Sequence, residues 1–274
     1  MEMVQLNNNV LMPQLGFGVF KVGNAEAEKA VSEALRIGYR SIDTATVYGN
    51  ESGVGQAISK SGIEREQLFI TTKVWNSDQG YENTLAAFNQ SLDKLKLDYV
   101  DLYLIHWPTP KYDLYIETYK ALEKLYQEGR IRAIGVSNFE VEHLERIINE
   151  CSITPAVNQV ECHPYFTQKE LKSFCSEKTI AFEAWSPLQR GRELLQDPAL
   201  YEIASVKKKT VAQIVLRWHL QENSIVIPKS VTPARILENL QVFDFELSPE
   251  EMNIIDQLNK NERCGSNPHT NNRR

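Results

Sequence analysis

The chain has 274 residues, of which 42% are hydrophobic and 24% are charged, and its formal net charge is -6. This apolar content is enough for a large folded core, so intrinsic disorder is not the default expectation. The acidic balance argues against a general nucleic-acid-binding protein, and no apolar run is long enough to span a membrane.

The N-terminus and the cysteines bear on the cellular location. The first residues, MEMVQLNNNV, lack the basic and apolar regions of a signal peptide. No C-x-x-C pair or zinc-finger spacing joins the four cysteines, which are Cys151, Cys162, Cys175 and Cys264. We therefore expect free thiols, no metal site and a cytoplasmic protein without a membrane segment. The sequence leaves the oligomeric state open, with a monomer as the default.

Short β-rich runs alternate with longer segments of helical periodicity along the whole chain. The segment VQLNNNVLMPQ comes first and is typical of a β-hairpin. Eight runs then have the nearly unbroken apolar interior of strands that are covered on both faces: LGFGVF, YRSIDTA, LFITTKV, YVDLYLIHW, IRAIGVSN, AVNQVECH, AFEAWSP and SIVIPK.

The segments between these runs carry helix signals. An apolar stripe follows Gly80, and a second stripe stops at Gly129, a typical C-terminal residue. Thr210 and Ser248 are predicted N-caps, and Ser248 is followed by Pro249 and, at the third helical position, by an acid.

Strands that alternate with helices predict parallel βαβ units, and eight such units close into a (β/α)8 barrel of about 250 residues. We expect the N-terminal β-hairpin to close the bottom of the barrel. No Gly/Ser/Pro-rich linker interrupts the series, so residues 1–274 are predicted to form one domain. The competing fold, a doubly wound open sheet, normally carries a G-x-G-x-x-G turn, but here Gly16 and Gly18 are followed by Lys21.

Polar residues close most of the predicted strands, at the end of the barrel where chemistry is found. The second strand runs into Asp43, with Tyr48 in the loop beyond it, the third ends at Lys73 and the fourth at His106. Each residue also has a structural interpretation: Asp43 could pair with Arg40, for example. However, 30 residues separate Asp43 from Lys73 and 33 separate Lys73 from His106, one βα unit each, so the fold would bring them together.

With these motifs in place, the sequence resembles the aldo-keto reductase family over essentially its whole length. The matching stretches are LGFGVF, SIDTATVYGNE, TTKVW, YLIHWP, GVSNF, NQVECHPY, EAWSPL and IPKSVTPARILEN. Within the family, the resemblance is to small bacterial glyoxal, methylglyoxal and 2,5-diketo-D-gluconate reductases and to prostaglandin F synthases. It implies a (β/α)8 barrel that reduces carbonyl groups with NADPH.

The resemblance places a catalytic tetrad at Asp43, Tyr48, Lys73 and His106. Tyr48 would donate the proton, and the Lys73 ammonium would lower the pKa of the phenol from its ordinary value of about 10. Asp43 would hold Lys73 in position, and His106 would orient the carbonyl.

The resemblance also implies a cofactor site and a substrate pocket. The cofactor residues would be Ser137, Asn138, Gln159, Trp185, Ser186, Leu188, Lys229, Ser230, Arg235, Glu238 and Asn239, with Trp185 stacked on the nicotinamide. The two cations, Lys229 and Arg235, favour NADPH over NADH. Phe20, Trp75, His106 and Trp107, together with Tyr48, would line a pocket for a small aldehyde, ketoaldehyde or dicarbonyl.

One loop and two other functions stay open at this point. After Leu188 many relatives continue with glycine, whereas Gln189 to Arg192 follow here, so the segment expected over the pyrophosphate departs from the family pattern. A reductase-like protein that binds the cofactor without catalysis is one alternative. A different barrel enzyme with Lys73 as a Schiff base is the other.

Overall fold

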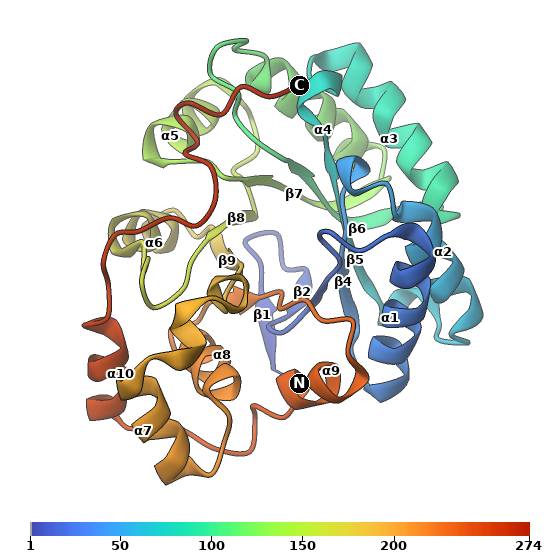
Figure 1. The fold of residues 1–274 in the computed structure, drawn as a ribbon. Coiled ribbons are helices and arrows are strands. Elements are labelled where there is room, and N and C mark those ends of the chain that lie inside the picture. Colours follow the sequence, from blue (N-terminus) through green and yellow to red (C-terminus); the bar gives the residue numbers. More distant parts are fainter. Residues whose placement is uncertain (1) are drawn as a thin grey trace.

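A computed structural model of the chain describes residues 2–274. Its strands are β1 (Met3–Gln5), β2 (Leu11–Pro13), β3 (Phe17–Gly18), β4 (Ser41–Asp43), β5 (Phe69–Val74), β6 (Val100–Ile105), β7 (Ile131–Ser137), β8 (Val157–Glu161), β9 (Ala181–Trp185) and β10 (Ile225–Val226). Strands β3 to β10 form one parallel sheet in sequence order. The helices surround this sheet, as expected for a (β/α)8 barrel (Figure 1).

Backbone hydrogen bonds between the first and last segments close the barrel. Gly16 donates its amide to the Val226 carbonyl at 2.8 Å, and Val226 donates to the Gln14 carbonyl at 2.9 Å. A further bond joins the Gly18 amide to the Pro228 carbonyl at 3.1 Å. Strands β3 and β10 are shorter than the apolar runs predicted from the sequence. The reason is that isolated hydrogen bonds, rather than a long β-ladder, join the first and last strands of the barrel.

The helices that cover the sheet are α1 (Asn24–Ile37), α2 (Glu51–Lys60), α3 (Tyr81–Leu95), α4 (Tyr115–Gln127), α5 (Val141–Glu150), α6 (Lys169–Glu177), α7 (Pro198–Lys207), α8 (Val211–Gln221), α9 (Pro233–Leu240) and α10 (Pro249–Asp256). The predicted helix starts are confirmed, since Thr210 and Ser248 both form capping boxes. None of the helices within residues 2–274 combines the length and the apolar character needed to cross a bilayer. All four cysteines are free.

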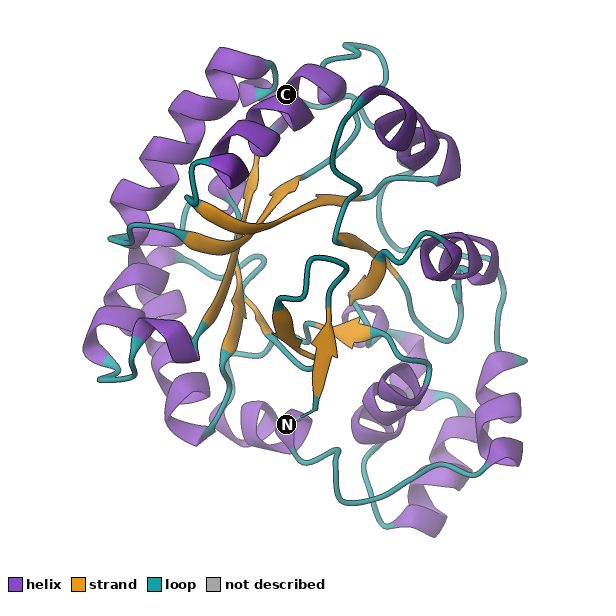
Figure 2. Ribbon diagram, turned by 180° about the vertical axis from the view of Figure 1, so that it is seen from behind, coloured by secondary structure: helices purple, strands orange, loops and turns teal. Residues whose placement is uncertain are grey.

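The β1–β2 hairpin lies against the start of the barrel strands, as the sequence predicted (Figure 2). Its apolar residues Leu6 and Met12 belong to a small core cluster with Phe69, Leu102 and Ile225, all of which are buried. The amides of two loop asparagines add bonds to carbonyls of the barrel. The hairpin therefore closes the bottom of the barrel, which leaves the opposite end, where the strands finish, for a site.

Candidate active site

The four residues of the predicted tetrad meet where strands β4, β5 and β6 end. Lys73 and Asp43 form a buried ion pair with 2.6 Å between Nζ and Oδ1, and Lys73 also donates to the Thr44 carbonyl at 2.9 Å. Lys73 Nζ lies 5.2 Å from the ring centroid of Tyr48, and the Tyr48 and His106 ring centroids are 5.6 Å apart. The predicted partner of Asp43 is therefore Lys73, whereas Arg40 donates to backbone carbonyls.

The loop between Asp43 and Tyr48 is held by its own hydrogen bonds. Asn50 accepts a bond from the Thr44 hydroxyl at 2.7 Å and donates to the carbonyls of Val19 and Val22. The short 3-10 helix η1 (Thr46–Tyr48) is bound to β5 by the Thr46 hydroxyl, which donates to the Lys73 carbonyl at 2.9 Å. These contacts, which the sequence did not single out, place the Tyr48 ring above Lys73.

Burial dominates the electrostatics of the tetrad. Burial raises the pKa of Tyr48 to about 12, while the Lys73 ammonium acts in the opposite direction. Lys73 lowers the pKa of the phenol, as expected, but desolvation of the phenolate outweighs the nearby cation, so the net shift in the cofactor-free protein is upward. For Lys73, burial opposes the charge, but the Asp43 carboxylate raises the lysine pKa overall. Burial and Lys73 hold the pKa of His106 well below its ordinary value, so its imidazole is neutral.

Aromatic rings surround Tyr48 and His106. The Phe20 ring centroid is 5.1 Å from that of Tyr48, and Trp75 meets His106 edge-on at 5.2 Å. Phe20 is 44% exposed, so it forms the outer rim rather than the floor. Trp107 is half-buried, and its carbonyl accepts a bond from Gln79 at 2.7 Å. Of the predicted pocket residues, Phe20 and Trp75 thus lie against rings of the tetrad, and Trp107 directly follows His106 in the chain.

The residues predicted to bind the nicotinamide form a connected set on β7, β8 and β9. Asn138 donates to the His106 carbonyl and the Ser137 hydroxyl, and it accepts a bond from the Trp185 indole at 2.9 Å. Both amide hydrogens of Asn138 are thereby used inside the protein. Asn138 therefore orients Trp185 and the backbone at His106. This role is additional to the direct cofactor contact that the sequence predicted for Asn138.

Gln159 also has internal partners. Its Nε2 donates to Asp43 at 2.8 Å and to Glu183 at 2.9 Å, which connects β8 to β4 and β9. The sequence reasoning assigned no role to Glu183. A single acid within the apolar run AFEAW was the signal that could have identified it, since an isolated buried carboxyl group requires a partner.

The segment after β9 runs across the edge of the site. Ser186 and Gln189 have positive φ angles of 50° and Arg190 one of 57°, and the 3-10 helix η4 covers Gln189–Gly191. Leu188 is half-buried against the core, and the Arg190 guanidinium lies 5.8 Å from the Trp185 ring centroid. Arg190 therefore reaches the aromatic residue that was predicted to stack on the nicotinamide.

The predicted phosphate-binding residues surround the start of α9. Thr232 is the N-cap of this helix and Pro233 its first residue, as predicted. Ser230 is buried and its hydroxyl accepts a bond from the Thr232 amide at 3.1 Å, while Lys229 and Arg235 are exposed. Asn239 is buried and Glu238 accepts a bond from the Thr210 hydroxyl at 2.9 Å. Two exposed cations and a helix N-terminus suit a phosphate group.

The C-terminal tail passes over this end of the barrel. The buried carboxylate of Glu161 accepts bonds from the amides of Cys264 and Gly265. Further along the tail, Asn76 donates to the Arg273 carbonyl at 2.7 Å.

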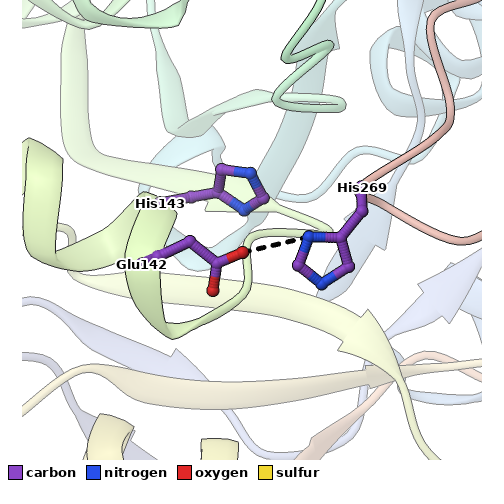
Figure 3. A group of neighbouring side chains, drawn as sticks. All are labelled: Glu142, His143 and His269. Carbon is purple, nitrogen blue, oxygen red and sulfur yellow. Dashed lines mark ion pairs between the residues drawn. The ribbon is translucent and has the colours of Figure 1, made fainter.

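A second contact joins the tail to α5. Figure 3 shows His269 of the tail facing Glu142, and the two form an ion pair at 3.0 Å. His143 lies beside them, and the three side chains could present ligand atoms within 4.8 Å of one another. Nδ1 of His143 accepts the Glu140 amide in the capping box of α5. The contact between Glu142 and His269 anchors the tail to this helix.

Comparisons with known proteins agree with this arrangement. A model described as Aldo/keto reductase family matches residues 14–260. The chain is 58% identical to glyoxal reductase of Bacillus subtilis (strain 168) and 51% identical to methylglyoxal reductase DkgA of Yersinia pestis, in both cases over 97% of this chain and 96% of the relative. The solved structure of a Gox0644 mutant in complex with NADPH has a TM-score of 0.95 and 45% identity, over 98% of each chain. The chain therefore belongs to the aldo/keto reductase family of oxidoreductases.

Proposed function

We propose that this enzyme reduces small aldehydes, ketoaldehydes or dicarbonyls to alcohols, with Tyr48 as the general acid. The observation that carries the proposal is the buried Lys73–Asp43 pair beneath Tyr48, with the neutral His106 ring beside it. The curated relatives named glyoxal reductase and methylglyoxal reductase DkgA support this substrate class.

The enzyme depends on NADP(H), and the residues present fit that cofactor. Lys229 and Arg235 are exposed beside the start of α9, where a phosphate would be favoured, and the relative Gox0644 was solved with NADPH. Trp185 is half-buried with its indole fixed by Asn138, so one ring face is held in position. When bound, the cofactor supplies the hydride that the carbonyl carbon receives.

Each tetrad residue has a separate task in delivering the proton. The carbonyl oxygen becomes an alkoxide-like, strongly basic atom as the hydride arrives, so a phenol with a pKa of about 12 is still acidic enough to protonate it. The Lys73 charge stabilises the phenolate that remains. Asp43 keeps that charge in place, and neutral His106 can donate a hydrogen bond to the same oxygen without competing for its proton.

A spectrophotometric assay with a panel of carbonyl compounds tests this function. We expect consumption of NADPH with glyoxal, methylglyoxal and other small dicarbonyls, and slower consumption of NADH. Binding of NADPH without turnover of any carbonyl would contradict the proposal and favour a protein that only binds the cofactor. Turnover without nicotinamide would instead indicate a Schiff-base reaction at Lys73, which borohydride trapping would detect.

A further inference from the structure

Glu183 is connected to the tetrad although it lies on a different side of the barrel. It is fully buried in the middle of β9, and Oε2 accepts a bond from Gln159 Nε2 at 2.9 Å. The same nitrogen donates to Asp43 Oδ2 at 2.8 Å. An amide nitrogen carries two hydrogens, so Gln159 gives one to each carboxyl group. The network therefore runs from Glu183 through Gln159 to Asp43 and on to Lys73.

The charges in this network do not balance if both acids are ionised. Lys73 is its one cation, and it bonds to Asp43 and the Thr44 carbonyl. Oε1 of Glu183 has no hydrogen-bond partner within residues 2–274. An unpaired carboxylate costs far more free energy to bury than a neutral carboxylic acid does.

The neighbouring strands offer no second cation. Strand β10, on one side of β9, contains only Ile225 and Val226. Strand β8, on the other side, contributes the acid Glu161, whose carboxylate is engaged by His163 and by amides of the tail. Burial and then the Asp43 charge raise the pKa of Glu183 to about 8, which agrees with the charge balance.

We propose that Glu183 is a positioning residue of the reductase reaction and that it must hold a proton during turnover. As a neutral acid, Glu183 accepts one Gln159 hydrogen while Asp43 accepts the other. The amide orientation is then fixed, and Oε1 of Gln159 is left to meet the cofactor. Once ionised, Glu183 would place a second negative charge near Asp43, raise the pKa of Tyr48 further and make Tyr48 a weaker acid.

The first test compares the pH dependence of kcat/KM for NADPH-dependent reduction in the wild type and in Glu183→Gln. Glutamine has the shape of the neutral acid but cannot ionise. We expect the wild type to lose about tenfold per pH unit above about pH 8, and E183Q to lack this alkaline decline. Glu183→Ala should lose activity at every pH, because Gln159 is no longer held. An E183Q profile that falls at the same pH as that of the wild type would overturn the proposal.

A matched control comes from Glu123, a buried acid of α4 whose carboxylate accepts the amides of Ser152 and Ile153, with no hydrogen bond to a tetrad residue. Glu123→Gln should keep the wild-type alkaline decline. If it removed the decline as E183Q does, the effect would not belong to Glu183 and the proposal would fail.

The second test uses the cofactor-free wild type and requires no variant to fold. Its infrared spectrum should contain the carbonyl band of a buried, un-ionised carboxylic acid at about pH 6, and that band should disappear at about pH 9.5. A spectrum without such a band at the lower pH would overturn the proposal. If E183Q folds, it should lack the band.

The third test measures the pH dependence of folding stability, again in the cofactor-free protein. The folded-state pKa of Glu183 is about 8 and its ordinary value is 4.5, so the folded protein retains a proton that the unfolded chain loses. Stability therefore falls as the pH rises between these values. The denaturant midpoint of the wild type should fall relative to that of E183Q across this window, and parallel curves would contradict the proposal.

This inference rests on the proposed function, but its failure can be told apart from failure of that function. The infrared and stability measurements do not involve Tyr48. Full turnover by Tyr48→Phe would disprove the role of Tyr48 as proton donor but would not affect the proposal that Glu183 is protonated. A missing acid band would disprove the protonation of Glu183 but would not affect the role of Tyr48.

Discussion

Asp43 is buried at the end of a strand, and the buried Lys73 ammonium one strand away compensates its charge. Removing one member of such a pair leaves an uncompensated charge, which costs about 3–5 kcal/mol. We therefore expect Lys73→Met to lower the free energy of unfolding by about this amount, as measured by denaturant titration. The double variant Asp43→Asn/Lys73→Met should recover much of the loss. Additive effects of the two substitutions would show that the pair does not act as a unit.

Tyr48 is the residue whose removal should affect chemistry alone. Tyr48→Phe keeps the ring that packs against Phe20 and His106 but lacks the proton. A positioned proton donor contributes typically 10²–10⁴-fold to the rate, so kcat should fall by about this factor. NADPH affinity, measured by fluorescence quenching, should stay close to that of the wild type. Turnover close to that of the wild type would disprove the assignment.

Arg235 is predicted to distinguish the two nicotinamide cofactors. It is exposed in the first turn of α9, where a phosphate of NADPH would be stabilised and NADH has no such group. Arg235→Glu should raise the KM for NADPH by at least about tenfold and that for NADH much less, because charge-assisted bonds contribute about 1.5–3 kcal/mol each. Equal changes in both KM values would exclude a phosphate contact.

At the scale of elements, the helices around the barrel are placed by close backbone contacts. A Cβ added to Gly55 of α2 would lie 2.4 Å from the carbonyl oxygen of Leu95, the last residue of α3. Helix propensity alone would make Gly55→Ala stabilising by about 1 kcal/mol. However, the added methyl group would overpack the contact between α2 and α3, and overpacking costs about 1–3 kcal/mol. The backbone of Leu95 cannot move aside as a flexible side chain could.

We therefore expect Gly55→Ala to lower the thermal unfolding midpoint. Gly23→Ala is the control, because a Cβ there meets nothing within 4 Å and φ is -66°. A stabilised Gly55→Ala variant would show that α2 and α3 can separate at little cost.

At the scale of the whole molecule, the tail brings the end of the chain to the mouth of the barrel. Deletion of residues 266–274 would remove the Arg273 carbonyl from Asn76, the neighbour of the predicted pocket residue Trp75, and His269 from Glu142. The KM for carbonyl substrates should then rise by several-fold, because Trp75 is less restrained, with a smaller change in the KM for NADPH. Proportional changes in both constants would indicate a general loss of folding instead.

The sequence by itself determined the order of strands and helices, the capping residues Thr210 and Ser248, and the spacing that brings Asp43, Lys73 and His106 to one end of a barrel. These features could be predicted because each depends on the periodicity of a local segment or on the length of a single βα unit. The hairpin at the bottom was also predictable, because its turn is local.

Only the tertiary structure decided the rest. Gln159 and Asp43 are 116 residues apart in the chain, and their contact, like that of Glu161 with the tail, exists only once the barrel has closed. The same holds for the direction of the Tyr48 pKa, which depends on how deeply the phenol is buried as well as on its cation. Desolvation is a property of all surrounding atoms together, so no spacing along the chain reveals it.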